Sequence, residues 1–274
     1  MITGRVERTV NYTILSVFSL VAVVPLLLVV IAALHRPGEV TGGFSFPSSP
    51  HFDTFVEAWS RGHFSAYLRS SAIVVVVVVL ATSVFSILAG YAFGTMRFPL
   101  SGPLFYLLLA GIIVPFESMV VPLYYDFRDL GLTDTYWALI LPQIGLSVSF
   151  GTFWMRAYFR SVPRELVEAA RMDGASTLRT LVRVLVPMGR PAIVTMMLVV
   201  FMWTWNEFLL ALVMVSNEGL RTAPLGLSYF QGRYGADIPS LSAASVIVAL
   251  PVVILYLFLQ RHFIAGMLGG ALKQ

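Results

Sequence analysis

The sequence predicts an all-α integral membrane protein with about six transmembrane helices. Of its 274 residues, 58% are hydrophobic and only 12% are charged, whereas a soluble domain usually carries about 25% charged residues. Several charge-free stretches are long enough to cross the hydrocarbon core of a bilayer, which takes about 20 apolar residues in a helix. A chain of this composition cannot bury its apolar surface in water, so we expect it to fold in a membrane.

Six charge-poor stretches are the candidate transmembrane helices. The first covers residues 12–34 and is too long for the apolar region of a cleaved signal peptide, so we expect a retained signal anchor. The other five are expected near residues 70–90, 104–124, 135–155, 192–214 and 243–259. Two stretches rich in Gly, Pro and Ser, residues 37–63 and 215–240, are expected to be external loops, the first with a short helix near residues 55–59.

The orientation follows from the basic residues. Lys and Arg near membrane segments favour the cytoplasmic side. With the N-terminus inside, twelve of the 18 Lys and Arg residues lie in the cytoplasmic segments, and acidic residues outnumber the basic ones in the external segments. An even number of spans then places both termini in the cytoplasm.

Several classes of function are excluded by composition. Lysine occurs once, at Lys273, where it cannot serve a P-loop, so the chain should not hydrolyse ATP itself. There is no cysteine, and the histidines show no metal-ligand spacing, so we expect no catalytic residue, metal site or cofactor. Because the arginines collect on one side of a membrane, no nucleic-acid partner is expected. The four histidines are His35, His51, His63 and His262.

The segment 161–192, between the fourth and fifth spans, is predicted to form two short amphipathic helices on the cytoplasmic side. Ser161 is expected to cap the first, with Pro163 in its first turn, and Gly174 ends it. Ser176 is expected to cap the second, before Pro187 ends it. The apolar positions of the second helix follow the i, i+3, i+4, i+7 spacing, at Leu178, Leu181, Val182 and Leu185. Such a pair can bind a partner, lie on lipid, or merely link two spans.

Three motifs in this order carry a family resemblance. The run Glu168-Ala169-Ala170, with Gly174 four residues later, resembles the EAA loop of binding-protein-dependent ABC-transporter permeases. Trp205-Asn206-Glu207-Phe208 resembles the WNEF motif of the carbohydrate-uptake, maltose-permease (MalG-like) branch, and residues 260–273 resemble its C-terminal tail. The resemblance covers roughly residues 67–273. The chain departs from the pattern at Leu268-Gly269 in the tail and at Glu117 in the third span.

The resemblance implies a permease subunit of an ATP-driven importer for a carbohydrate or carbohydrate-like solute, in a bacterial or archaeal cell membrane. Implied partners are a second homologous permease, two cytoplasmic ATPase subunits that bind ATP and Mg, an external solute-binding protein and the lipid bilayer. Residues 1–66 would form an N-terminal transmembrane helix and external loop. Residues 67–274 would form the permease core with helices 2–6.

Three sets of site residues follow. The resemblance assigns coupling to the ATPase to Glu168, Ala169, Ala170, Arg171, Asp173 and Gly174. Polar and aromatic groups within the spans suggest a translocation pathway at Glu117, Tyr125, Trp203, Trp205, Asn206 and Glu207. The last external loop offers binding-protein contacts at Tyr229, Phe230, Tyr234 and Asp237. A structural alternative for Asn206 and Glu207 is bonding to the partner permease or bracing a bent helix.

Two other functions were weighed. A secondary transporter could use buried Glu117 and Glu207 to carry protons or cations, but it leaves the EAA loop unexplained and the halves of the chain show no similarity to each other. An intramembrane enzyme would need a metal pair or a nucleophile with its base, and neither is evident.

Overall fold

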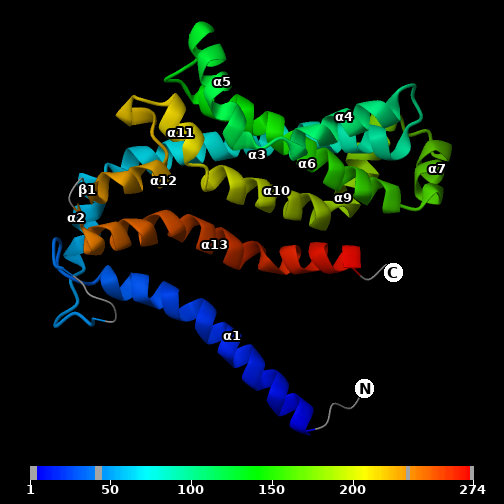
Figure 1. Cartoon of the computed structure of the whole chain (residues 1–274). Coiled ribbons are helices and arrows are strands. Elements are labelled where there is room, and N and C mark those ends of the chain that lie inside the picture. Colours follow the sequence, from blue (N-terminus) through cyan, green and yellow to red (C-terminus); the bar gives the residue numbers. More distant parts are fainter. Residues whose placement is uncertain (1–4, 41–44, 233–234, 272–274) are drawn as a thin grey trace. The chain divides into compact units, whose positions relative to one another are not determined.

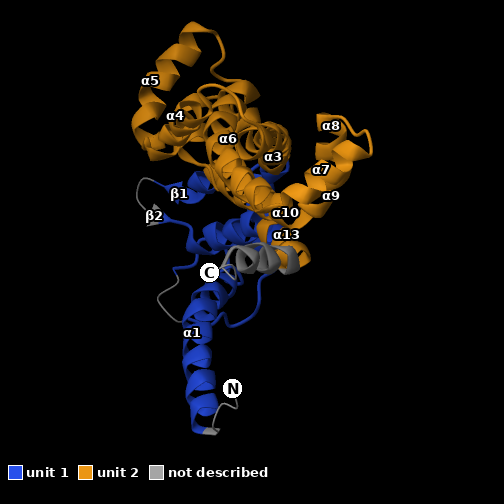
Figure 2. Cartoon of the chain, turned by 90° about the vertical axis from the view of Figure 1, so that its right-hand side faces the viewer, with its two compact units in different colours: residues 1–65, 226–251 blue, residues 66–225, 252–274 orange. Residues whose placement is uncertain are grey.

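The computed structural model is mostly helical and describes residues 5–40, 45–232 and 235–271 (Figure 1). Four helices are long and apolar enough to cross a membrane, and two bent helix pairs raise this number to six if each pair is one span. The predicted all-α fold with several spans is therefore confirmed. The chain divides into two compact units, Met1–Ser65 with Gly226–Pro251, and Ala66–Leu225 with Val252–Gln274 (Figure 2).

The first unit contains the N-terminal span. No residue in the most apolar window of this span is buried inside the chain, so the side chains of the span are available to lipid. The short helix expected near residues 55–59 is present as α2, and Thr54 in its first turn donates a hydrogen bond of 2.7 Å to the carbonyl of His35. The elements of this unit are α1 (Arg5–Ala32), α2 (Asp53–Arg61), η3 (Leu227–Phe230), β1 (Gln231–Gly232), β2 (Gly235–Ala236) and the start of α13 (Ile238–Ala271).

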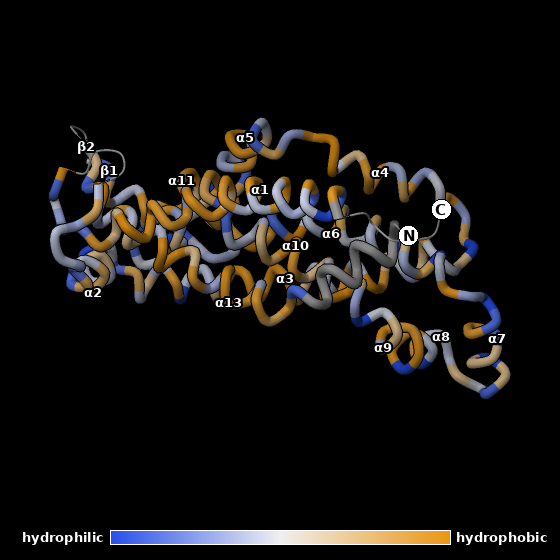
Figure 3. The backbone as a smooth tube through the Cα atoms, turned by 90° about the horizontal axis from the view of Figure 1, so that it is seen from below, coloured by the Kyte–Doolittle hydropathy of each residue, from blue (hydrophilic) through white to orange (hydrophobic). Residues whose placement is uncertain are grey.

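The second unit contains the remaining helices, and α7 combines hydrophilic and hydrophobic residues (Figure 3). Its elements are α3 (Phe64–Thr95, which begins in the first unit), α4 (Ser101–Ile113), α5 (Phe116–Asp129), α6 (Tyr136–Ser161), α7 (Arg164–Met172), α8 (Thr177–Thr180), the π-helical turn η1 (Leu181–Leu185), α9 (Val186–Met188), α10 (Arg190–Trp205), α11 (Leu209–Met214), η2 (Glu218–Leu220), α12 (Ala223–Gly226) and the end of α13.

Close packing of α3 on α6 depends on glycine. A Cβ atom on Gly90 would lie 2.5 Å from Cβ of Met155, and one on Gly94 would lie 3.0 Å from Cβ of Phe159. The two glycines are four residues apart and therefore lie on one face of α3. Small residues at this spacing allow two helix backbones to approach closely in a membrane.

The predicted third span is not one straight helix. α4 ends at Ile113, α5 begins at Phe116, and the two are bent by 96°. Val114 has an extended backbone, with ψ of 122°. The cause is Pro115, because a proline disfavours the helical conformation of the residue before it and has no N–H to donate.

The predicted fifth span, residues 192–214, is also interrupted. α10 ends at Trp205 and α11 begins at Leu209. Upstream, the segment Thr177–Met188 meets α10 at an angle of 80°. A Cβ atom at the corner residue, Gly189, would lie 2.6 Å from the ring of Tyr158, so only glycine lets α6 pack this closely against the corner.

The two predicted helices of the 161–192 segment are present, with one cap placed differently. Ser176 caps the second helix, because its hydroxyl accepts a hydrogen bond of 3.4 Å from the amide of Arg179. Ser161 does not cap the first helix. It belongs to the end of α6, its hydroxyl donates to the carbonyl of Tyr158, and the residue before α7 is Pro163. The expectation for Ser161 was wrong because α6 continues to Ser161, nearly two turns beyond the end of the predicted span at residue 155.

Replacing Gly90 with alanine is expected to destabilise the α3–α6 contact by about 1–3 kcal/mol, because the added methyl group overpacks against Met155. The control is Gly145→Ala in α6, where a Cβ atom meets nothing within 4 Å. Both changes bring the same gain in helix propensity. Thermal unfolding in detergent should show a lower midpoint for Gly90→Ala only, and equal midpoints would contradict the packing role.

Candidate functional site

The second unit contains a groove with a volume of about 730 Å³. It is lined by the first turn of α5, the middle of α6, the end of α10 and the break before α11. Four of the six predicted pathway residues line it, namely Glu117, Trp203, Asn206 and Glu207. The groove therefore brings together residues from the third and fifth predicted spans.

The other two predicted pathway residues lie elsewhere. Trp205 is 5% exposed and its ring stacks on Phe201, with centroids 5.6 Å apart, so it is a core residue of this unit. Tyr125 is exposed and lies beside the guanidinium of Arg128, at 4.9 Å from its ring centroid. Neither side chain lines the groove.

Glu207 stabilises the break between α10 and α11. Its carboxylate accepts hydrogen bonds from the amides of Leu210, at 2.7 Å, and Ala211, at 3.2 Å. These amides lie in the first turn of α11 and have no partner within the helix. The bracing role that the sequence left as an alternative thus has direct geometric support, although the same side chain also lines the groove.

The groove offers several hydrogen-bond acceptors and no cationic side chain. The side-chain amide nitrogens of Asn206 and Gln143 each donate 2.8 Å hydrogen bonds, to the carbonyls of Met202 and Leu139, which leaves their carbonyl oxygens available. Glu117 has no hydrogen bond or ion pair among the described residues. No Lys, Arg or His lines the groove. Such a surface suits a solute rich in hydroxyl donors and disfavours an anionic one.

Three polar groove residues were not predicted from the sequence, namely Gln143 and Ser147 of α6 and Thr204 of α10. All three are buried and lie inside predicted spans. Their polarity within an apolar stretch was the signal that could have identified them.

The loop helix α7 has no buried residue and is followed by a glycine in the left-handed conformation. Gly174 has φ of +75°, its amide donates to the carbonyl of Arg171, and the amide of Ala175 donates to Ala170. This is a glycine-terminated helix end, which turns the chain sharply and satisfies the last carbonyls. A Cβ atom on Gly174 would meet nothing within 4 Å, so the requirement is conformational.

Two faces of α7 differ in their surroundings. Arg164, Val167, Glu168 and Arg171 line a pocket formed with the ends of α3 and α6. Of the six predicted coupling residues, Glu168 and Arg171 therefore lie on this pocket. The other four, Ala169, Ala170, Asp173 and Gly174, do not line it.

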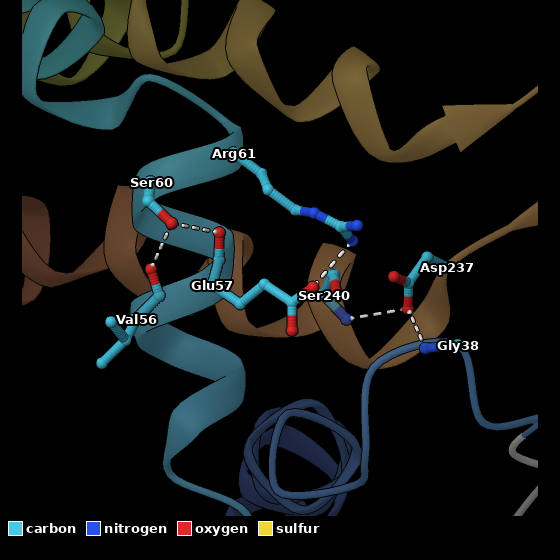
Figure 4. A network of polar contacts seen from close by, with 7 residues as sticks. All are labelled: Gly38, Val56, Glu57, Ser60, Arg61, Asp237 and Ser240. Carbon is cyan, nitrogen blue, oxygen red and sulfur yellow. Dashed lines mark hydrogen bonds and ion pairs between the residues drawn. The ribbon is translucent and has the colours of Figure 1, made fainter.

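In the loop before α13, which the sequence predicts to be external, the four predicted contact residues differ in exposure. Tyr229 is exposed, whereas Phe230 is 6% exposed and stacks on Phe64, with ring centroids 6.5 Å apart. Tyr234 lies outside the described residues. Asp237 is half-buried and holds two backbone segments together (Figure 4).

The contacts of Asp237 are with the loop after α1 and with its own helix. Its carboxylate accepts hydrogen bonds from the amides of Gly38, at 3.1 Å, and Ser240, at 3.2 Å. Partial burial would raise the pKa of Asp237, but these hydrogen bonds and the charge of Arg61 outweigh burial and hold the pKa below its ordinary value of 3.8. The charged form of Asp237 is therefore the one that the fold favours.

The lowered pKa of Asp237 predicts how the stability of the fold changes with pH. A carboxylate whose pKa is lower in the folded state than in the unfolded state stabilises the fold at pH values above its unfolded pKa. This stabilisation is lost as the pH falls through the folded pKa. We expect the difference in unfolding midpoint between wild type and Asp237→Asn to be largest near neutral pH and to shrink below about pH 4. A difference that stays constant down to this range would show that the charge of Asp237 is irrelevant.

Removal of the Glu207 carboxylate should loosen the start of α11. Each hydrogen bond to a charged acceptor is worth about 1.5–3 kcal/mol. Glu207→Ala removes two such bonds and should therefore speed amide hydrogen exchange at Leu210 and Ala211 by roughly 10-fold or more. Glu117→Ala is the matched control, because that carboxylate makes no such contact. Unchanged exchange in Glu207→Ala would exclude the bracing role.

Comparison with known proteins identifies the family. The family described as the binding-protein-dependent transport system inner membrane component matches residues 1–268. A putative ABC transporter permease protein of Caldicellulosiruptor sp. (strain Rt8B.4) is 36% identical over 96% of both chains. The trehalose/maltose transport system permease protein MalG of Thermococcus litoralis is 38% identical over 77% of this chain and 76% of that protein.

A solved structure has the same fold. A chain of a bacterial ABC transporter involved in the import of the acidic polysaccharide alginate aligns with a TM-score of 0.80 and 23% identity, covering 96% of this chain and 99% of that one. The family match spans nearly the whole sequence and accounts for the apolar spans and the motifs together. The chain therefore belongs to the binding-protein-dependent transport system inner membrane components, and is a non-catalytic, multi-pass membrane subunit.

Proposed function

We propose that this permease carries a carbohydrate or carbohydrate-like solute, delivered by an external binding protein, in an importer driven by ATP. The family match over residues 1–268 is the observation that carries the proposal. The relative from T. litoralis is named for trehalose and maltose, and the acceptor-rich groove suits a hydroxyl-rich solute. In this proposal the membrane is the bacterial or archaeal cell membrane, with both termini in the cytoplasm.

The groove forms this chain's share of the translocation pathway, and a second homologous permease supplies the rest. Glu117 and the carbonyl oxygen of Asn206 accept hydrogen bonds from solute hydroxyls. Trp203 is 53% exposed and offers a ring face on which a sugar can stack. Residues 1–66 form the N-terminal helix and external loop, and residues 67–274 form the core that contains the groove.

Energy reaches the groove from two cytoplasmic ATPase subunits, which bind ATP and Mg, while this chain binds neither. One ATPase subunit docks on the α7 segment through Glu168, Ala169, Ala170, Arg171, Asp173 and Gly174. A continuous path then leads inward. Leu181 and Leu185 are buried in one cluster with Met155 and Phe159 of α6, so a displacement of α7 and α8 is carried into the helices that position the groove.

The same path reaches the groove through α10. The hydroxyl of Tyr158 donates a 3.0 Å hydrogen bond to the carbonyl of Leu185, just before the corner at Gly189. Beyond that corner, α10 runs to Trp205 and presents Trp203 to the groove. Movement of the corner therefore moves the residues that contact the solute.

On the outside, the binding protein docks on the loop before α13. Tyr229 is the exposed aromatic contact, and Asp237 fixes the loop to Gly38. In this proposal Phe230 supports the surface from beneath, because its ring is buried against Phe64.

The coupling role is tested by two substitutions at Gly174. Valine is strained at φ of +75°, whereas asparagine tolerates a positive φ. In a complex with the second permease, the ATPase and the binding protein, we expect Gly174→Val to reduce solute-stimulated ATP hydrolysis by at least 10-fold, and Gly174→Asn to retain most of it. Equal activity of wild type and both variants would contradict the coupling role. Solute uptake that persists without ATP would also contradict the proposal, and it would favour a secondary transporter using Glu117 and Glu207.

A further inference from the structure

A second concave surface of the Ala66–Leu225 unit differs from the groove in its position and its charge. It is a pocket of about 770 Å³ formed where α3 and α6 end and where α7 begins. Its polar lining is dominated by four arginines, Arg97, Arg160, Arg164 and Arg171, with Glu168 as the one acidic residue. Of these five charged residues, the ATPase contact proposed above uses only Glu168 and Arg171, and it leaves Arg97, Arg160 and Arg164 without a role.

The charge of the pocket is not neutralised within the chain. Four guanidinium groups face one carboxylate, which leaves a net charge of +3 from these five residues. Among the described residues, none of these arginines forms an ion pair, whereas four ion pairs occur elsewhere in the chain. Arginines that converge on a concave surface without counter-charges form an anion-binding surface.

The chemistry of arginine favours a phosphate group as the anion. A guanidinium presents its N–H donors in a planar fork that matches phosphate oxygens and remains charged at all physiological pH values. Three separate segments supply the arginines, because Arg97 follows α3, Arg160 lies in the last turn of α6, and Arg164 and Arg171 lie on α7. An anion held here would bridge elements that otherwise repel one another.

The position of the pocket favours a lipid as the source of the phosphate. α3 and α6 are both candidate membrane spans, and the pocket lies at the end of each. Phospholipid headgroups occupy this level of a bilayer, and basic pockets between transmembrane helices bind anionic headgroups. Met96 lines the pocket and is 40% exposed, so an apolar contact for the lipid lies beside the charges.

The pocket occupies only one face of α7. Arg164, Val167, Glu168 and Arg171 follow the i, i+3, i+4, i+7 spacing and therefore share a face. Ala169 and Asp173 lie on the opposite side of the helix, are exposed and do not line the pocket. Ala169 and Asp173 therefore remain available to the ATPase while a lipid occupies the first face, and of the proposed docking residues only Glu168 and Arg171 lie on the lipid face.

We propose that this arginine pocket binds the phosphate-bearing headgroup of an anionic phospholipid. The bound headgroup neutralises the arginines and holds α7 against the ends of α3 and α6. The loop that faces the ATPase is thereby positioned by the membrane as well as by the chain. This site is independent of the solute and of the groove.

The test measures lipid binding to the purified full-length chain. Binding of phosphatidylglycerol and of phosphatidylcholine is compared by native mass spectrometry for wild type, Arg97→Gln/Arg164→Gln and the control Arg179→Gln/Arg183→Gln. The control removes the same charge from two exposed arginines outside the pocket. We expect phosphatidylglycerol to be preferred by wild type and control, and to bind about fivefold more weakly for each pocket arginine removed.

Three outcomes would overturn the proposal. Equal losses in the pocket variant and the control would show a general charge effect. Competition by inorganic phosphate alone at comparable concentration would identify a small-anion site in place of a lipid site. Displacement of phosphatidylglycerol by the ATPase subunit, with loss of ATPase affinity in the pocket variant, would make the pocket a protein interface.

Discussion

Close contact between α3 and α6 is the packing constraint on which the second unit depends. Gly90 and Gly94 bring the backbone of α3 onto α6, and Gly151 brings α6 onto Ser86 in the same way. α6 in turn contacts α4, α10 and α11. In lipid there is no hydrophobic force between helices, so such close small-residue contacts supply much of the association energy. α6 contributes to both concave surfaces described above, with its middle to the groove and with its end to the arginine pocket.

The functional elements lie where the helices are interrupted. Every backbone polar group within a bilayer needs a partner, so a break in a span persists only where side chains or a cavity satisfy the free groups. At the break after α10, Glu207 does this for the amides of Leu210 and Ala211, and the groove lies beside it. At the corner before α10, Gly189 and Tyr158 let the loop turn towards α7. In the proposed mechanism, these two breaks connect the groove with the α7 segment along one continuous path.

Much of this arrangement was predictable from sequence, because its signals are local. Long apolar stretches marked the spans, the Asp173-Gly174 pair marked the end of α7, and Ser176 marked the next helix start. The bend at Pro115 was not predicted, since prolines also occur within helices of membrane proteins, including α6 here. The burial of Trp205 and Phe230 depends on which face packs against neighbours far away in sequence. The packing role of Gly90 and Gly94 was not predicted either, because it depends on Met155 and Phe159 opposite them.

We propose that the groove beside α10 is the solute pathway. The chain has no cysteine, so single-cysteine variants can test this directly. Single-cysteine variants Trp203→Cys and Trp205→Cys are reconstituted with the partner subunits and treated with a polar maleimide. We predict that Trp203→Cys is labelled, that the transported sugar with its binding protein and ATP slows the labelling, and that Trp205→Cys resists the reagent. If neither the sugar nor ATP changes the labelling rate of Trp203→Cys, the groove is not the solute pathway.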